Sequence, residues 1–291
     1  MFDGFYTTPP VYENIYRAVY DLKGRFDGLR AFPIGESARG RGILALALGD
    51  LRGATLLVGG THGSEWLTTL LLFRFCEDLL LAQEQGGVLG EIDITKALEN
   101  HSLVIVPCLN PDGVQIALGK DQPPPKSAPG SPWQANGNGV DLNHNFDAGW
   151  ELLHKMEEQE GYIGPGPTRY GGKRPHSEPE TRAIAGFCLA CDFRRVYAFH
   201  SQGEEIYYEY GADTPNRSRL MAEVLAASCG YKVCRPEKIA SHGGFKDWFI
   251  HTMHRPGFTI EIGRGKNPLP IEELEPIYAR LLEMLLLTML L

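Results

Sequence analysis

The sequence lacks a disulfide framework, a secretory signal and a membrane-spanning run. Its six cysteines are scattered through apolar or helical segments without regular spacing, which suits reduced thiols in a cytosol. The first residues contain no basic segment followed by an apolar one, so we expect no signal peptide. The most apolar stretch, 281–291, is too short to span a bilayer and contains Glu283. We therefore expect a cytoplasmic protein whose last segment is a docked helix.

Basic residues are also fewer than acidic ones. The chain has 28 Lys and Arg against 36 Asp and Glu, a net charge of −8. This excess of acid argues against nucleic acid or an anionic membrane as a partner. No repeat or break in composition divides the 291 residues, so we expect a single domain covering 1–291. No feature indicates an oligomeric state.

Apolar runs of strand length alternate with helical patterns along the chain, which is typical of an α/β fold. We predict one α/β/α sandwich on a mixed, mostly parallel sheet. Segments 119–140 and 161–172 are rich in Pro and Gly, and the first is long enough to be a functional lid or a disordered loop. The predicted strands are 29–34, 42–48, 54–59, 101–107, 196–200 and 257–262. The predicted helices are 11–26, 65–82, 94–98, 177–191, 216–228, 246–254 and 271–290, of which 177–191 opens with the capping pattern Ser-x-x-Glu.

The stretch His62-Gly63-Ser64-Glu65 lies between a predicted buried strand and a predicted helix. Ser64 stands where a helix N-cap is expected. An imidazole and a carboxylate three residues apart across a tight corner are within reach of one ion. Such a pair also arises by chance, as a partly exposed His beside a Glu in the first helical turn. The rest of the chain favours the metal site.

Four polar residues, His62, Asn110, His200 and Glu261, lie at or near the ends of predicted strands. Open α/β sheets bind ligands at the carboxyl ends of their strands, so we expect these side chains at one edge, where Glu65 joins them. Two His and one Glu form the ligand set of a catalytic zinc whose fourth position is left to water. The same set also suits other divalent ions.

Six motifs occur in order along the chain. They are HGSE at 62–65, NPDG at 110–113, DLNHNF at 141–146, His200-Ser201, GGFKDW at 243–248 and FTIE at 258–261. In order and spacing they resemble the zinc metallocarboxypeptidase family of the carboxypeptidase A and B type, across nearly the whole chain. The resemblance implies a zinc carboxypeptidase-like fold, also described as phosphorylase/hydrolase-like.

Within that family, further segments are most similar to the bacterial γ-D-glutamyl-diaminopimelate endopeptidases, which cut peptidoglycan stem peptides. These segments are WQANGNGVDLN at 133–143, PTRYGG at 167–172, SEPE at 177–180, HSQGEEIYY at 200–208, and KDWF through RPGFTIEIGRGKNPLP at 246–270.

The resemblance implies one Zn²⁺ per chain, bound by His62, Glu65 and His200. It implies that Glu261 takes a proton from the zinc-bound water and delivers it to the leaving amine. The alternative for Glu261 is a buried acid paired with a base. Asp141 is expected to orient the His62 imidazole; its alternative is a turn-forming Asp after Gly139.

Several positions depart from the family pattern. Gln134 and His144 stand where the resemblance leads us to expect two arginines, one for the oxyanion and one for the terminal carboxylate of the substrate. An imidazole cannot reproduce the bidentate fork of a guanidinium. Asn143 of the carboxylate clamp remains. The family's tyrosine over the cleft aligns near Ile239, and His242 is the nearest polar residue that could fill its space.

Other residues are candidates for binding the substrate's acidic groups. Lys246 falls at a position that lines the specificity pocket in the family, and Arg169 and Arg264 are further cations. For each of the three, a solvated surface charge is the competing interpretation. Gln202 either hydrogen-bonds the substrate or supports the third ligand. Glu204 and Glu205 receive no assignment.

We therefore predict a one-zinc peptidase that cuts the γ-D-glutamyl–diaminopimelate bond of peptidoglycan stem peptides, an activity of cell wall turnover. Its expected partner is a peptide or muropeptide substrate. Three alternatives stay open: a metallocarboxypeptidase of altered C-terminal specificity, a deacylase of N-acyl amino acids, and a non-catalytic peptide-binding protein that kept its zinc. The last alternative is motivated by Gln134, where an arginine is expected.

Overall fold

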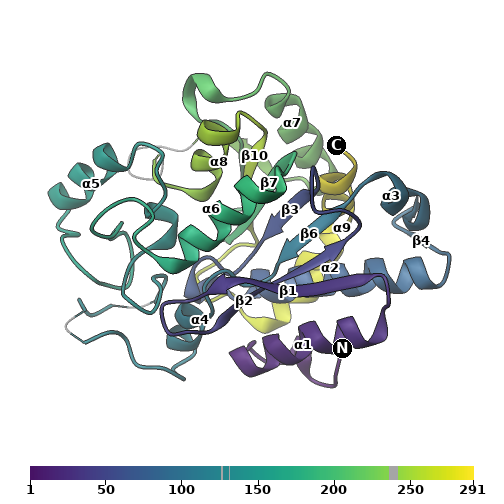
Figure 1. The fold of residues 1–291 in the computed structure, drawn as a ribbon, viewed down its shortest axis with the longest axis horizontal. Coiled ribbons are helices and arrows are strands. Elements are labelled where there is room, and N and C mark those ends of the chain that lie inside the picture. Colours follow the sequence, from purple (N-terminus) through teal and green to yellow (C-terminus); the bar gives the residue numbers. More distant parts are fainter. Residues whose placement is uncertain (126, 131, 236–241) are drawn as a thin grey trace.

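The computed structural model describes residues 1–291 apart from 126, 131 and 236–241. Its described part is built on an eight-stranded sheet with the order β1-β2-β6-β3-β7-β10-β8-β9 (Figure 1). The strands are β1 (Leu29–Glu36), β2 (Gly42–Leu48), β3 (Thr55–Val58), β6 (Leu103–Val106), β7 (Arg195–Ser201), β8 (Glu205–Tyr207), β9 (Lys232–Cys234) and β10 (Gly257–Ile262). A separate hairpin pairs β4 (Val88–Leu89) with β5 (Ile92–Asp93).

The sheet is mixed and mostly parallel, as predicted. β6, β3, β7 and β10 run parallel in its middle, and β8 runs parallel to β9. The antiparallel pairs are β1–β2, β2–β6 and β10–β8. Leu, Ile, Val and Ala dominate the central strands, since a strand covered on both faces needs apolar side chains on both.

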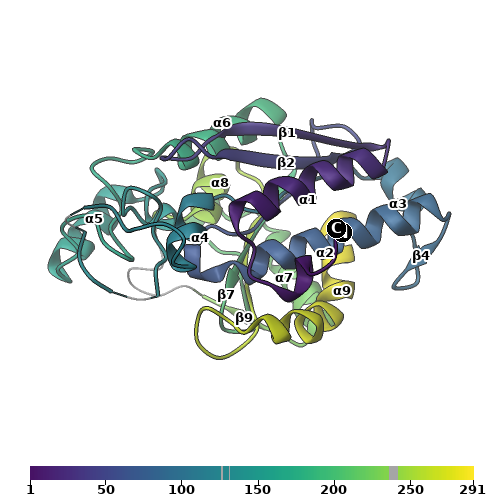
Figure 2. The same ribbon diagram turned by 90° about the horizontal axis from the view of Figure 1, so that it is seen from below.

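Helices cover both faces of the sheet, which confirms the α/β/α sandwich. Side chains of α1, α2, α3, α7 and α9 form one core cluster, and those of α6 and α8 belong to the other. Figure 2 shows α6 and α9 on opposite sides of the sheet. The helices are α1 (Tyr12–Arg25), α2 (Leu67–Glu84), α3 (Ile94–Asn100), α4 (Pro111–Ala117), α5 (Trp150–Gln159), α6 (Pro179–Cys191), α7 (Ser218–Cys229), α8 (Phe245–Met253) and α9 (Leu274–Leu290).

Two predicted helix starts are wrong. Ser64 does not cap α2, because a 3-10 turn over Gly63–Glu65 intervenes and α2 begins only after Trp66. Ser177 does not cap α6: the helix begins after Glu178, and the Ser177 hydroxyl donates instead to the Glu178 carboxylate.

The end of the chain docks as predicted. Leu281, Leu285 and Met289 of α9 are fully buried in the core cluster that α2 and α7 share. No helix among the described residues combines the length and the apolarity needed to cross a membrane. All six cysteines are free thiols, in line with the absence of a disulfide framework. The cellular compartment stays a prediction.

The parallel strands position the chemistry. β3, β7 and β10 are neighbours that point the same way, so their carboxyl ends meet at one edge of the sheet. His200 near the end of β7 pairs in register with Glu261 of β10. His62 lies a few residues beyond the end of β3. Residues more than a hundred positions apart in the sequence therefore come together at this edge.

Candidate metal centre and active site

The corner after β3 carries the first two predicted ligands. His62 has an extended backbone and is followed by the 3-10 turn that contains Glu65. A side chain on Gly63 would collide with the backbone of Gly113, where α4 packs against this turn. Glycine is therefore required between the two polar residues, and the turn aims the imidazole and the carboxylate at the same point.

His62, Glu65 and His200 converge. The His62 Nδ1 atom lies 2.9 Å from one carboxylate oxygen of Glu65, and the His200 Nδ1 atom lies 3.0 Å from the other. The two Nδ1 atoms are 3.3 Å apart. One ligand atom from each of the three residues lies within 4.8 Å of the other two. All three side chains are buried or nearly so.

This arrangement fits a zinc ion. Two imidazole nitrogens and a carboxylate oxygen that face one another across a few ångströms form a three-residue donor set with room for a further ligand. Both imidazoles present the same type of atom, Nδ1, to the centre of the group. The Glu65 carboxylate also accepts a hydrogen bond from the backbone N–H of Ser201 at 3.2 Å, which fixes its orientation.

Asp141 contacts the far side of the His62 ring. The His62 Nε2 atom lies 3.1 Å from one oxygen of Asp141, so an N–H at that position donates to the carboxylate and leaves Nδ1 free to bind a metal. The backbone N–H of Arg169 donates to the other Asp141 oxygen at 2.8 Å. Asp141 also caps the 3-10 turn Leu142–His144 through the N–H of Asn143. Both interpretations of Asp141 thus describe real contacts.

The local charges shift the pKa values of these groups. Burial would lower the pKa of His62, but the carboxylates of Glu65 and Asp141 raise it well above its usual value. Burial acts to raise the pKa of Glu65, yet the two imidazoles lower it to about 2. Asp141 is also buried, and the imidazoles of His144 and His62 hold its pKa below the usual range. Both carboxylates are therefore ionised at neutral pH.

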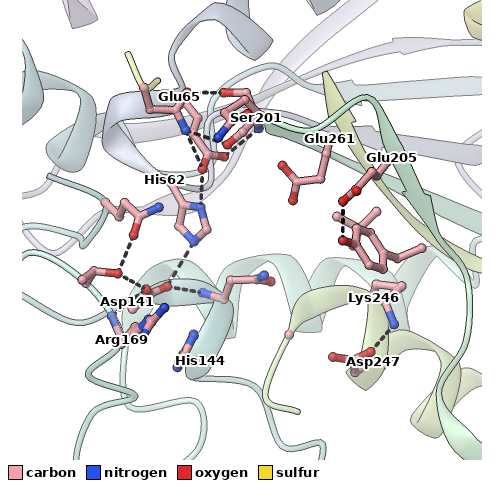
Figure 3. Close-up of a pocket in the computed structure, with 18 of the residues that line it drawn as sticks. His62, Glu65, Asp141, His144, Arg169, Ser201, Glu205, Lys246, Asp247 and Glu261 are labelled. Carbon is pink, nitrogen blue, oxygen red and sulfur yellow. Dashed lines mark hydrogen bonds and ion pairs between the residues drawn. The ribbon is translucent and has the colours of Figure 1, made fainter. Parts of the chain in front are cut away.

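Glu261 lies beside this group on β10. Burial and the neighbouring charge of Glu65 raise its pKa well above the usual value, with a further contribution from Glu205. Figure 3 shows Glu261 between the His62–Glu65 pair and Glu205. No ion pair joins Glu261 to a base in the described part of the chain, contrary to the alternative of a structural pair. A carboxyl group of raised pKa is suited to proton transfer near neutral pH.

A cavity of about 430 Å³ opens in front of these residues. Most of the predicted site residues line it, namely His62, Glu65, Gln134, Asp141, Asn143, His144, Arg169, Gln202, His242, Lys246 and Glu261. His200 is buried and does not line the cavity. Arg264 is outside the cavity: its exposed guanidinium pairs with Glu204 at 2.6 Å. The surface-charge interpretation therefore holds for Arg264.

His144 and Gln134, which replace the expected arginines, face the cavity, and each is hydrogen-bonded to a neighbouring side chain. The His144 Nδ1 atom lies 2.9 Å from the fully buried carboxylate of Glu157. Gln134 accepts a hydrogen bond from the Thr168 hydroxyl. Both side chains thus have defined orientations, although neither carries a guanidinium.

The two cations that line the cavity already have acidic neighbours. Lys246 donates to the side chain of Asp247 and, at 2.8 Å, to the backbone carbonyl of Glu209. Arg169 lies 3.1 Å from Glu160 and stacks over Tyr162. Lys246 is buried, whereas Arg169 is partly exposed at the rim.

The remaining predicted residues complete the lining. The Asn143 side chain accepts a hydrogen bond from the N–H of Phe245 at 3.0 Å, which ties it to the start of α8. His242 packs against the ring of Tyr210. Gln202 is exposed beside the third ligand. Ile239, with which we aligned the family's cleft tyrosine, lies outside the described residues.

The sequence prediction missed several lining residues, among them Glu205, Tyr207, Asp247 and Asn267. Glu205 and Tyr207 alternate on the short strand β8, and their i, i+2 spacing could have revealed them. Asn267 could not be found this way: it reaches Ser201 and Glu65 from a loop that no periodicity describes. Asn110, by contrast, is not at the cavity; it caps α4 and donates to the backbone of Thr61.

Comparison with known proteins agrees with this geometry. Residues 15–284 match the zinc carboxypeptidase family. A γ-D-glutamyl-L-diamino acid endopeptidase 1 from Lysinibacillus sphaericus is 34% identical over 92% of this chain and 69% of its own. The uncharacterised protein YqgT of Bacillus subtilis is 32% identical over 84% of this chain and 68% of its own.

Solved structures show the same fold. Carboxypeptidase A from Helicoverpa armigera superposes with a TM-score of 0.77 at 19% identity, covering 97% of this chain and 73% of that one. The murein-tripeptide amidase MpaA from Escherichia coli O157 has a TM-score of 0.54 at 22% identity, covering 87% and 91%. The family match, the likeness to the Lysinibacillus enzyme and the His-Glu-His group agree, and the chain belongs to the zinc carboxypeptidase family of Zn²⁺-dependent metallopeptidases.

Proposed function

We propose that this metallopeptidase hydrolyses the bond between γ-D-glutamate and diaminopimelate in peptidoglycan stem peptides. The observation that carries the proposal is its 34% identity to the Lysinibacillus γ-D-glutamyl-L-diamino acid endopeptidase over 92% of the chain. The cavity supports it, because its lining includes both cations, such as Lys246 and Arg169, and acids, such as Glu205. A γ-D-glutamyl–diaminopimelate unit carries carboxylates and an amine and matches such a mixed surface.

In this proposal His62, Glu65 and His200 hold the Zn²⁺ ion. When bound, the ion supplies Lewis-acid polarisation of the scissile carbonyl and lowers the pKa of its water to about 7. Glu261 accepts the proton of the attacking water and passes it to the leaving amine. Its raised pKa suits the first step, because it makes Glu261 a stronger base than an ordinary carboxylate. Asp141 keeps the His62 ring in the orientation and tautomer that present Nδ1 to the ion.

The other lining residues bind the substrate. Asn143 and His144 face the cavity from the loop after Asp141 and supply an amide and an imidazole, while Gln134 supplies a second amide. These groups recognise carboxylate and carbonyl oxygens by single hydrogen bonds, in place of the bidentate grip of an arginine. Arg169, Lys246, His242 and Gln202 complete the binding surface. Strict recognition of a C-terminal carboxylate, as in a plain carboxypeptidase, is therefore not expected.

The test compares substrates on purified protein whose metal content has been measured. We expect one zinc per chain and cleavage of L-Ala-γ-D-Glu-meso-diaminopimelate, with at most slow release of residues from plain peptides with free C-termini. Preference for the plain peptides would make the protein a carboxypeptidase of altered specificity. Cleavage of N-acyl amino acids alone would make it a deacylase. Tight binding of the muropeptide without turnover would make it a binding protein.

A further inference from the structure

One end of the cavity carries an acidic residue that the proposed mechanism does not use. Glu205 lies on β8, which pairs antiparallel with β10, so that Glu205 is directly opposite Glu261 and Tyr207 is opposite Thr259. Residues directly opposite on an antiparallel pair project from the same face of the sheet. All four line the cavity, and Figure 3 shows Glu205 beside Glu261 with Lys246 and Asp247 nearby.

This placement puts two acidic side chains next to each other on the same face of the sheet. Like charges directly opposite each other on neighbouring strands destabilise a sheet. The Tyr207 hydroxyl donates to one Glu205 oxygen at 2.6 Å and holds the carboxylate in place. Among the described residues, no Lys, Arg or His forms an ion pair with Glu205. The carboxylate is therefore oriented by a neutral partner and faces the cavity.

Neither nearby lysine forms an ion pair with Glu205: Lys232 is its neighbour in register on β9, and Lys246 contacts Asp247. Lys246 and Asp247 are in direct contact and neutralise each other as a pair. The Lys246 ammonium is further occupied by the Glu209 carbonyl. With this pair neutral, Glu205 leaves this end of the cavity acidic. An acidic, partly buried end that holds one cation beside its acids favours a ligand bearing an ammonium group, with or without a carboxylate next to it.

We propose that Glu205 is a specificity-determining residue that binds the second amino group of the diamino acid. The inference rests on the proposed function and makes it sharper: the protein selects substrates whose diamino acid has a free side-chain ammonium. Tyr207 orients the carboxylate. The competing role for Glu205 is indirect, namely raising the pKa of its neighbour Glu261.

The experiment uses two tripeptides that differ in one group. They are L-Ala-γ-D-Glu-meso-diaminopimelate and its analogue with 2-aminopimelate, which lacks only the distal amine. We expect wild-type kcat/KM to be about tenfold or more higher for the diaminopimelate peptide, the worth of one charge-assisted hydrogen bond. In Glu205→Gln, an isosteric change, that ratio should fall to near one, because the lost contact raises KM for the diaminopimelate peptide more than for the analogue.

Glu204→Gln is the matched control. It removes the same charge one residue away, from a side chain that pairs with Arg264 and Arg280 outside the cavity lining. Its substrate ratio should equal that of the wild type, and Glu205→Asp should recover part of the preference. Calorimetry gives a second readout that does not depend on turnover. It compares binding of the diaminopimelate peptide to Glu261→Gln with binding to the double variant Glu261→Gln/Glu205→Gln. The double variant should bind about tenfold more weakly.

The outcomes distinguish a failure of the Glu205 assignment from a failure of the proposed function. If wild-type protein cleaves the diaminopimelate peptide but Glu205→Gln leaves the substrate ratio unchanged, the assignment of Glu205 fails while the proposed function stands. If Glu205→Gln slows both substrates equally and moves the pH–rate profile, Glu205 acts through Glu261 instead. If wild-type protein cleaves neither peptide, the proposed function fails, and the role of Glu205 in it fails as well.

Discussion

The cavity has two walls that are held in place by different kinds of interaction. The strand wall consists of Glu261 on β10 and of His62 and Glu65, which lie a few residues beyond the end of β3, together with the buried third ligand His200 on β7. The loop wall consists of Gln134, Asp141, Asn143, His144 and Arg169, which come from segments without β-strands. The backbone ladder of the sheet fixes the first wall, because its hydrogen bonds set the position of every side chain along each strand.

The loop wall depends on buried polar side chains instead. Asn136, which is fully buried, donates to Glu178 at 2.9 Å and to Glu180 at 3.0 Å. Asn145 donates to the carbonyl of Gly171 at 2.7 Å, and Glu157 accepts from the N–H of the same residue at 3.0 Å. Buried networks of this kind are stable only while every member is satisfied. Substitutions in the strand wall should therefore change catalysis or metal binding. Substitutions in the loop wall should change substrate binding, protein stability or the pH dependence of stability.

The largest effect is expected at Glu261 on the strand wall. Glu261→Gln should keep its metal and lower kcat/KM by about 10³-fold, because the amide cannot take a proton from water. His200→Ala, on the same wall, should lose the metal as well as the activity. Metal analysis and steady-state kinetics on the same samples separate the two cases. Turnover by Glu261→Gln at the wild-type rate would show that the general base lies elsewhere.

Asp141 connects the two walls, and its substitution should have the next largest effect. Asp141→Asn removes the charge that supports the His62 ring and should weaken zinc binding by about 10–100-fold in competition with a chelator. Asp147→Asn is the control, since Asp147 is an exposed carboxylate in the same segment. Unchanged zinc affinity in Asp141→Asn would mean that Asp141 serves only to cap the turn Leu142–His144.

The strand wall is the part that sequence patterns could predict. Short runs of aliphatic and aromatic residues identify β3, β7 and β10, and the polar residues at their ends follow from the geometry of parallel sheets. The His-Glu-His group was found for this reason. The same reasoning placed Asn110 at the strand edge, although it caps α4: the following Pro111 at N1 is a helix-start signal that went unused.

For the loop wall, the sequence predicted which residues belong to the site but not the contacts that hold them in place. The resemblance to metallocarboxypeptidases named Gln134, His144 and Arg169, but no local pattern reveals that Glu157 or Glu160 holds them. Those contacts join segments that lack periodicity. β8 and β9 escaped prediction because each has only three residues, so the i, i+2 spacing on β8 is a single repeat and a weak signal. Lys246 illustrates the limit: its position was expected, but its pairing with Asp247 was not.

The pH dependence of stability should come partly from the loop wall. Burial raises the pKa of Glu180 from 4.5 to about 7, although the N–H of Ala38 and the Asn136 amide both stabilise the carboxylate. Between these two values the native protein keeps a proton that the unfolded chain releases. The unfolding free energy that Glu180 contributes is therefore full below pH 4.5 and is lost as the pH rises through 7.

Glu180→Gln tests this sign, because glutamine does not titrate. Relative to the variant, the unfolding free energy of the wild type should fall by on the order of 3 kcal/mol between pH 4 and pH 8, measured by urea denaturation at fixed zinc concentration. Glu272→Gln, an exposed surface change, should follow the wild type at every pH. Parallel curves for wild type and Glu180→Gln would show that the network around Asn136 holds no titrating proton.

The smallest effect distinguishes a cation of the loop wall from one outside the cavity. Arg169 lines the cavity rim, whereas Arg264 pairs with Glu204 at the surface and does not line it. Arg169→Ala should raise KM for the diaminopimelate tripeptide about fivefold at low ionic strength, because one partly screened contact to a substrate carboxylate is lost. Arg264→Ala should stay within about twofold of the wild type, as expected for an exposed ion pair.

The two arginine variants share the same loss of charge, so long-range electrostatics affects both and cancels in their comparison. Raising the salt concentration should bring Arg169→Ala and the wild type together if the contact is a direct but solvent-exposed ion pair. A larger loss for Arg264→Ala than for Arg169→Ala would mean that the loop beyond β10, and not the loop wall, binds the acidic groups of the substrate. The substrate would then lie along the strand wall alone.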